Sequence, residues 1–262
     1  MNFLRSLLHM LWMVLTVIPW GLSAVVLAPL ARRSPRVRHG WFYQLCADWL
    51  RMAVWGARAI CGVRWRITGM EHVPATGPAV LLCKHQSAWE TLALPALLPR
   101  PLAYVFKREL LRIPFFGWAL GSLDMIHIDR SQRLASVKLV VKEGRRLLQQ
   151  GVLVTLFPEG TRVARGQRGK YLSSGAQLAV SCGAPVVPIA VTSARCWPPR
   201  SFVKVPGVVE VSIGAPIATE GRKSAEVMAE VEQWIEAEMQ RLDAEAYAGQ
   251  PRENVPETPQ QG

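Results

Sequence analysis

The feature that most constrains the fold is an apolar run at residues 79–83, which leads directly into Lys84 and His85. A short continuous apolar run bounded by turn residues is typical of a buried strand. Ser87 can cap a helix that starts near Ala88, because a serine hydroxyl accepts a hydrogen bond from a free N–H of the first helical turn. The stretch therefore predicts a buried strand, a turn that carries a histidine, and a helix.

Short apolar runs recur from Val63 onward and alternate with segments of helical periodicity. Besides 79–84, strands are expected at 63–68, 102–106, 125–128, 152–157, 185–191 and, as an edge strand, 208–213. Helices are expected at 91–98, 131–150, 174–182 and 225–246, and the inward face of the second holds Leu134, Val137, Val140, Val141, Leu147 and Leu148. Strands alternating with helices indicate an α/β fold: a single domain with a mixed, mainly parallel sheet flanked by helices.

Glu90 follows His85 by five positions, about one turn into the expected helix. The turn between them can return the carboxylate to the imidazole. A histidine held by a carboxylate keeps one tautomer and can accept a proton from a hydroxyl. An isolated His–Glu pair is more often surface chemistry, so the pair becomes informative only beside a second motif. A Cys83–His85 nucleophile is the alternative, although a cysteine on a buried strand is more often a small core residue.

The second motif is FPEGTR at residues 157–162, which also follows an apolar run. Further motifs follow the same order as boxes of one known family: 107–110, 113–117 and 128–130 for its second box, and 186–189 for its fourth. Together they resemble the lysophosphatidate acyltransferases, a family of glycerolipid acyltransferases with H-x4-D and FPEGTR boxes. The resemblance covers roughly residues 69–216, and it departs from the family at position 90, where Glu stands in place of Asp.

The resemblance implies a membrane-bound 1-acylglycerol-3-phosphate O-acyltransferase. Such an enzyme transfers an acyl group from acyl-CoA or acyl carrier protein to the free hydroxyl of lysophosphatidate and gives phosphatidic acid. It implies His85 as general base, oriented by Glu90, with direct attack and no covalent enzyme intermediate. The implied substrate-binding residues are Lys107, Arg130, Glu159, Gly160, Thr161 and Arg162, of which Glu159 either helps to bind the glycerol phosphate acceptor or shapes its site. No metal and no cofactor is expected, since the acyl thioester is a co-substrate.

The cationic residues of this set suit a phosphate, because the planar fork of arginine can bind two oxygens. The alternative for Arg130 and Arg162 is solvated charge at loop ends. Family members often carry Lys before the glycine of a later helix, where this chain has Ser174, and Arg168 or Lys170 could take that role. Two other functions remain open: acyl transfer to a different lysolipid, and membrane-lipid binding without catalysis.

Composition favours a membrane over nucleic acid as the partner. Hydrophobic residues make up 50% of the 262 residues, the formal net charge is +12, and there are ten tryptophans. Such a basic, apolar chain suits nucleic acid or an anionic membrane, and tryptophan favours the headgroup level. No zinc-finger or RNP pattern supports nucleic acid. The five cysteines show no C-x-x-C spacing, which indicates reduced thiols in a domain that faces the cytosol.

Residues 6–31 carry no charged side chain apart from His9. About 20 apolar residues suffice to cross a bilayer. Because Pro19 and Pro29 interrupt the segment, a kinked or re-entrant helix is one alternative geometry, and a cleavable signal peptide is another. Four arginines lie at 32, 33, 36 and 38, so the positive-inside rule places the following chain in the cytoplasm, at the cytoplasmic (inner) membrane.

Residues 41–62 predict a second helix that lies in the membrane interface, because Asp48, Arg51 and Arg58 argue against a full span. An ordinary packing helix is the alternative. We therefore divide the chain into N-terminal membrane-anchoring helices at 1–62, an acyltransferase domain at 63–247, and a tail at 248–262. The tail has too few apolar residues to fold and is expected to be disordered.

Overall fold

A computed structural model describes residues 1–129 and 132–248 of the chain. Within them, one seven-stranded sheet has the order β1-β7-β6-β2-β5-β3-β4. The strands are β1 (Val63–Thr68), β2 (Val80–Cys83), β3 (Leu102–Lys107), β4 (Ile126–Ile128), β5 (Leu153–Leu156), β6 (Val186–Val191) and β7 (Gly207–Ile213). The long helices are α1 (Asn2–Ala31), α3 (Tyr43–Cys61), α4 (Trp89–Leu97), α6 (Arg133–Gln149), α7 (Ser174–Cys182) and α8 (Ser224–Leu242), and shorter ones are α2 (Pro35–Val37) and α5 (Phe116–Ser122).

The sheet is mixed and mainly parallel, which confirms the expected fold class. Strands β6, β2, β5, β3 and β4 run parallel to one another, whereas β7 pairs antiparallel with β6 and parallel with β1. The predicted edge position of 208–213 is wrong, because β7 lies between β1 and β6. Alternating hydrophobicity reports that one face of a strand is less covered, and it carries no information about whether both edges are paired.

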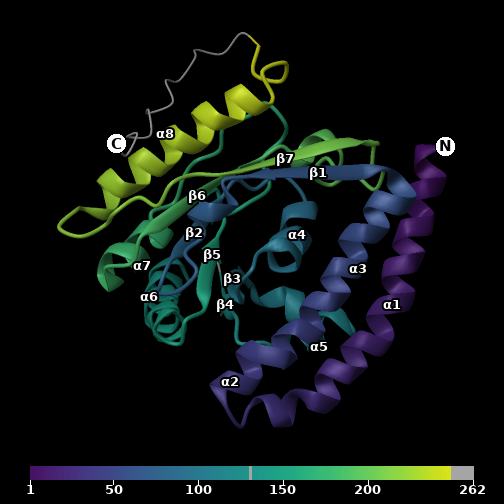
Figure 1. Ribbon diagram of the computed structural model, residues 1–262, viewed down its shortest axis with the longest axis horizontal. Helices are drawn as coiled ribbons and strands as arrows, with labels where there is room; N and C mark the ends of the chain where they lie inside the picture. Colours follow the sequence, from purple (N-terminus) through teal and green to yellow (C-terminus); the bar gives the residue numbers. More distant parts are fainter. Residues whose placement is uncertain (130–131, 249–262) are drawn as a thin grey trace.

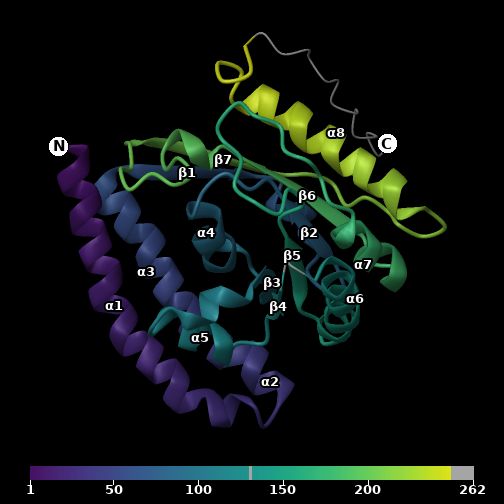
Figure 2. The same ribbon diagram turned by 180° about the vertical axis from the view of Figure 1, so that it is seen from behind.

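Helices cover both faces of the sheet, so the domain has three layers (Figures 1 and 2). Helices α6, α7 and α8 lie on one face and α1, α3, α4 and α5 on the other. Alternate residues of β2 enter the two cores: Leu81 packs with α3 and α4, and Leu82 packs with α7 and α8. Because both faces are covered, the central strands are almost entirely apolar, as the run at 79–83 predicts, and Thr155 of β5 is a buried polar exception.

Two sequence expectations for the helices need correction. Leu134 was expected on the inward face of its helix, but it is 82% exposed, whereas Val140 and Leu147 of the same helix are buried. Leu134 lies in the first turn of α6, before the helix reaches the residues that pack on the sheet. The predicted cap, Ser131, lies outside the described residues. Helix α8 ends at Leu242, four residues before the predicted end at Ala246.

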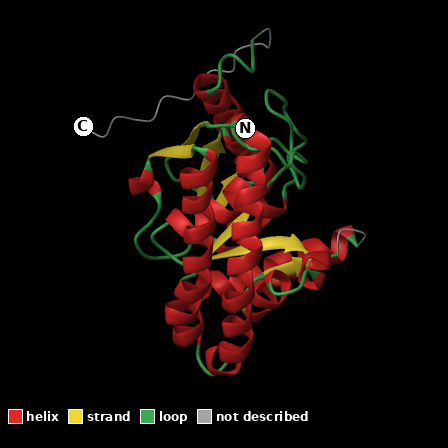
Figure 3. Ribbon diagram, turned by 90° about the vertical axis from the view of Figure 1, so that its right-hand side faces the viewer, coloured by secondary structure: helices red, strands yellow, loops and turns green. Residues whose placement is uncertain are grey.

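Helix α3 packs as an ordinary core helix. Its residues Ala53, Val54 and Ala57 are buried in the core that α4 and the sheet share. It also packs along α1, and Figure 3 shows these two long helices side by side. Trp55 remains 51% exposed on its outer face. Helix α3 therefore packs on the core along one side, and its exposed aromatic side is compatible with the predicted position in a membrane interface.

Helix α1 runs unbroken from Asn2 to Ala31 through both prolines. Among the described residues it is the helix long and apolar enough to cross a membrane, and only 11% of its most apolar window is buried. Its outward leucines include Leu4, Leu8 and Leu15, which are 68%, 55% and 67% exposed. An apolar face of this size on one helix is compatible with membrane association.

Candidate active site

The predicted motifs meet at one end of the sheet, beyond the carboxyl ends of its parallel strands. His85 follows β2, the FPEGTR loop follows β5, and Lys107 ends β3. Since these strands are parallel, their carboxyl ends lie at the same end of the sheet, and open α/β sheets bind their ligands there. The order of the strands thus gathers segments that are separated by up to about 75 residues in the chain.

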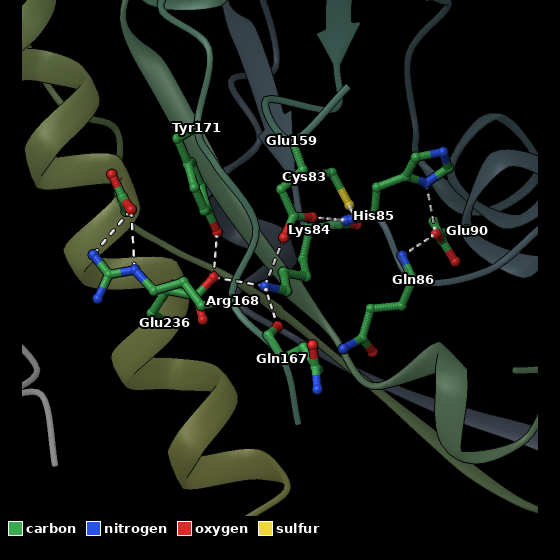
Figure 4. Close-up of polar contacts among 11 residues, drawn as sticks. Cys83, Lys84, His85, Gln86, Glu90, Glu159, Gln167, Arg168, Tyr171 and Glu236 are labelled. Atoms are coloured by element: carbon green, nitrogen blue, oxygen red, sulfur yellow. Dashed lines mark hydrogen bonds and ion pairs between the residues drawn. The ribbon is translucent and has the colours of Figure 1, made fainter. Parts of the chain in front are cut away.

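His85 and Glu90 form the predicted pair. The imidazole Nδ1 lies 2.9 Å from Glu90 Oε1, and Figure 4 shows the carboxylate returning to the ring across the turn. Ser87 Oγ accepts a hydrogen bond from the N–H of Trp89, the first residue of α4, at 3.1 Å, but the N-cap position belongs to Ala88, one residue later than predicted. The second ring nitrogen, Nε2, has no hydrogen-bond partner within the described chain, which leaves it available to a substrate hydroxyl.

Glu90 is fully buried and its carboxylate is surrounded by donors. Besides His85, Oε1 accepts from the N–H groups of Gln86 at 2.7 Å and Ser87 at 2.6 Å. The hydroxyl of Ser193 donates to Oε2 at 2.6 Å. A carboxylate that accepts on both oxygens is held in one orientation. With Glu90 as acceptor, Nδ1 of His85 carries the hydrogen and Nε2 carries the lone pair of a general base.

The FPEGTR loop holds the backbone of His85 from both sides. Glu159 Oε2 accepts from the N–H of His85 at 2.8 Å, and the N–H of Val163 donates to the carbonyl of His85 at 2.8 Å. The Phe157 ring stacks on the imidazole, with centroids 4.0 Å apart and an angle of 20° between the planes. Gly160 turns the loop at a φ of +66°, a conformation that favours glycine. The loop therefore fixes both the backbone of His85 and the plane of its ring.

Glu159 is a buried residue of this loop. Its Oε1 lies 2.7 Å from Nζ of Lys84, and both side chains are fully shielded from water. Burial raises the pKa of the Glu159 carboxyl, and the Lys84 ammonium opposes that shift. Of the two roles that the resemblance implied for Glu159, acceptor binding and shaping of the site, this geometry favours the second.

The remaining predicted residues lie at the surface of the same end of the sheet. Thr161 and Arg162 are exposed, and Lys107 is 47% exposed with Glu109 at 3.6 Å. Arg130 lies outside the described residues. Their exposure leaves Arg162 and Lys107 accessible to an anionic ligand.

The structure also shows the surroundings of three further residues near the site. Arg168 donates to Glu232 of α8 at 2.9 Å, so its guanidinium is engaged away from the His85 turn. A side chain at Gly175 would collide with Leu82, because an added Cβ would lie 2.4 Å from its methyl group, so the glycine permits close packing of α7 on β2. Cys83 is fully buried and burial raises the pKa of its thiol well above the usual range, which fits a core residue.

Sequence reasoning missed Ser193, Lys84 and Glu236 as members of this site. Ser193 follows β6, in the segment after the fourth box, and its spacing to Glu90 carries no local signal. Lys84 immediately precedes His85 in the chain. A lysine in a turn is expected to be exposed to solvent unless its buried partners are known. The partner Glu236 is 152 positions away in the chain.

Comparisons with known proteins show the family and the fold. The acyltransferase family model matches residues 64–192. The chain is 39% identical to the 1-acyl-sn-glycerol-3-phosphate acyltransferase of Pseudomonas aeruginosa over 242 residues, 91% of each chain. It is 32% identical to the mouse 1-acyl-sn-glycerol-3-phosphate acyltransferase alpha over 66% of this chain and 61% of that protein. The crystal structure of the 1-acyl-sn-glycerophosphate acyltransferase PlsC from Thermotoga maritima has the same fold, with a TM-score of 0.77 at 20% identity over 93% of this chain and 96% of that one.

Proposed function

This chain belongs to the lysophosphatidate acyltransferase family, and from that premise we propose that it transfers an acyl group from an acyl thioester to lysophosphatidate and so makes phosphatidic acid. The observation that carries the proposal is the His85–Glu90 pair, 2.9 Å apart at the carboxyl ends of the parallel strands. The names of the relatives support the acceptor. Acyl-CoA and acyl carrier protein both remain candidates for the donor.

In the proposed mechanism His85 acts as the general base. Its Nε2 accepts the proton of the lysophosphatidate hydroxyl while the hydroxyl oxygen attacks the thioester carbonyl, which forms the new C–O bond. Glu90 stabilises the resulting imidazolium through Nδ1. The tetrahedral intermediate collapses with cleavage of the C–S bond, and the imidazolium returns its proton to the departing thiolate. The products are phosphatidic acid and a free thiol, and His85 is again neutral.

We assign the phosphate of the acceptor to the cationic residues at the rim of the site. Arg162 and Lys107 are exposed beside the His85 turn, and by resemblance Arg130 belongs to the same group. A guanidinium can offer two parallel N–H groups to a phosphate and fixes its position as well as its charge. Holding the phosphate would place the glycerol hydroxyl in register with the base.

Arg162→Ala is expected to raise the KM for lysophosphatidate by roughly ten- to a hundredfold, since a charge-assisted hydrogen bond contributes about 1.5–3 kcal/mol. The KM for the acyl donor should change little. Steady-state kinetics with each substrate varied in turn measures both. The matched control is Arg66→Ala, an exposed arginine on β1 that pairs with Glu210 at 3.3 Å. Equal changes for both substrates of the Arg162 variant would instead indicate a structural role.

We further propose that α1 attaches the enzyme to the inner membrane, with the catalytic domain on the cytoplasmic side. The apolar outer face of α1 supports attachment, and the four arginines that follow it support the orientation. Such attachment would let lysophosphatidate reach the site from the bilayer in which it resides.

Replacing Leu8 and Leu15 together by glutamate is expected to weaken binding to anionic lipid vesicles by about 100-fold or more, because each buried leucine contributes about 1.5–3 kcal/mol. Both leucines are more than half exposed, so the fold should persist. Vesicle co-sedimentation of the full chain measures the effect. Leu134→Glu, on the 82% exposed leucine of α6, is the control and should bind as the parent does. Undiminished binding of the double variant would exclude α1 as the anchor.

The test of the function itself is acyl transfer by the purified full chain in detergent. The assay offers lysophosphatidate and several other lysolipids as acceptors, with acyl-CoA and acyl carrier protein as donors. Transfer to lysophosphatidate is the expected result. Transfer only to another lysolipid would overturn the acceptor, and lipid binding without transfer to any acceptor would overturn catalysis.

A further inference from the structure

A fully buried lysine stands directly before the candidate base. Lys84 follows the last residue of β2, and its side chain has no exposure to water. Its Nζ lies 2.7 Å from Glu159 Oε1 and 2.6 Å from Glu236 Oε1. It also donates to the carbonyl of Gln167 at 3.2 Å. The ammonium thus donates hydrogen bonds to Glu236 and Gln167 and forms an ion pair with Glu159, and such pairing is what burial of a charge requires.

A continuous chain of polar contacts runs from α8 to the backbone of His85 (Figure 4). Glu236 of α8 binds Lys84, Lys84 binds one oxygen of Glu159, and the other oxygen of Glu159 accepts from the N–H of His85 at 2.8 Å. The hydroxyl of Tyr171 donates to Glu236 Oε1 at 2.7 Å and fixes the far end of the chain. Every member therefore has a defined orientation.

The charges of the cluster make Lys84 essential to its arrangement. One ammonium faces two carboxylates, Glu159 and Glu236, whose side chains are 0% and 3% exposed. Without Lys84 the two carboxylates would face each other in a buried site with no cation between them, and repulsion would move them apart. Glu159 could then no longer hold the His85 N–H in its present geometry.

We propose that Lys84 and Glu236 are positioning residues of the acyl transfer reaction: through Glu159 they fix the backbone of His85 and so aim its imidazole at the acceptor hydroxyl. The inference rests on the function proposed above. Neither residue touches the substrate, because both are buried. Helix α8, which is remote from the His85 turn in the chain, thereby becomes part of the catalytic machinery.

The experiment compares Lys84→Met, Glu236→Gln and the double variant Lys84→Met/Glu236→Gln in the purified full chain. Lys84→Met should lower kcat by about 10- to 100-fold, since a misplacement of about 1 Å has that effect, with little change in either KM. Glu236→Gln should lose less, because the amide oxygen still accepts from Lys84. The double variant should recover part of kcat relative to Lys84→Met, because it restores the net charge of minus one.

A second cycle tests whether Lys84 acts through Glu159. If it does, Lys84→Met/Glu159→Gln should lose no more activity than the worse of its two single variants. The matched control is Glu230→Gln, also on α8, which removes a carboxylate paired with Arg222 at 2.7 Å and should keep the kcat of the parent. Thermal unfolding of each variant gives the folded fraction to which kcat is normalised.

Three results would overturn the inference. The first is a normalised kcat for Lys84→Met equal to that of the parent. The second is that the losses of Lys84→Met and Glu159→Gln multiply in the double variant. The third is that Lys84→Met raises a KM and leaves kcat unchanged. If Lys84→Met does not fold, the double variant with Glu236→Gln carries the test: a reduced kcat with unchanged KM supports the inference, and a parental kcat overturns it. A parent chain without transfer would overturn the proposed function, and this inference with it.

Discussion

Replacing His85 by alanine is expected to abolish detectable acyl transfer while the protein stays folded. The imidazole is the group that lies free to accept the hydroxyl proton, and general base catalysis alone contributes about 10²–10⁴-fold to a rate. The effect should fall on kcat, because the variant leaves unchanged the residues proposed to bind the phosphate, Arg162 and Lys107. Turnover at saturating lysophosphatidate, measured beside thermal unfolding, separates lost chemistry from lost structure.

His72→Ala is the matched control for this variant. His72 follows β1, which runs antiparallel to β2, so His72 and His85 lie at opposite ends of the strands. There His72 Nδ1 lies 2.8 Å from the carbonyl oxygen of Ile213. It should retain transfer. A folded His85→Ala protein with more than a few per cent of parental turnover would contradict the role of His85 as base, and the pH dependence of the residual rate would then point to another group.

The sequence alone was sufficient for the layout of the fold and for the central pair. Apolar runs located the strands because a sheet covered on both faces needs apolar side chains along its whole length. The five-residue spacing located Glu90 because its return to His85 is a local event within one turn. Both conclusions depend on residues that are neighbours in the chain, and periodicity and spacing report on those.

What the sequence could not supply are contacts between segments that are far apart in the chain. Ser193 meets Glu90 only because β6 pairs with β2, and Glu236 meets Lys84 only because α8 packs on that side of the sheet. The interior position of β7 depends in the same way on which strands pair across the sheet. Hydrophobic patterning indicates how deeply a residue is buried, but it does not indicate which distant segment packs against that residue.

Glu90→Gln is expected to lose most activity, on the order of 10²- to 10⁴-fold in kcat. The amide keeps the size of the side chain, and its oxygen can still accept from the N–H groups of Gln86 and Ser87 and from His85. It lacks the negative charge that stabilises the imidazolium formed as the hydroxyl proton moves. The substitution therefore separates charge from orientation, and kcat of the folded variant is the measurement.

Glu90→Asp restores the residue usual in the family, and it should also be impaired. The present carboxylate reaches His85 with one oxygen and Ser193 with the other, at 2.9 and 2.6 Å. An aspartate is shorter by one methylene, so we expect it to keep the contact with His85 and to lose the one with Ser193 unless the turn moves. Loss of one hydrogen bond to a buried carboxylate costs about 1–3 kcal/mol, which predicts a roughly ten- to hundredfold lower kcat. Ser193→Ala should lose activity in the parent and little more in the Glu90→Asp background, because the contact is already broken there. The idea is falsified if Glu90→Asp turns over as fast as the parent, since the longer arm would then have no function that the shorter one lacks.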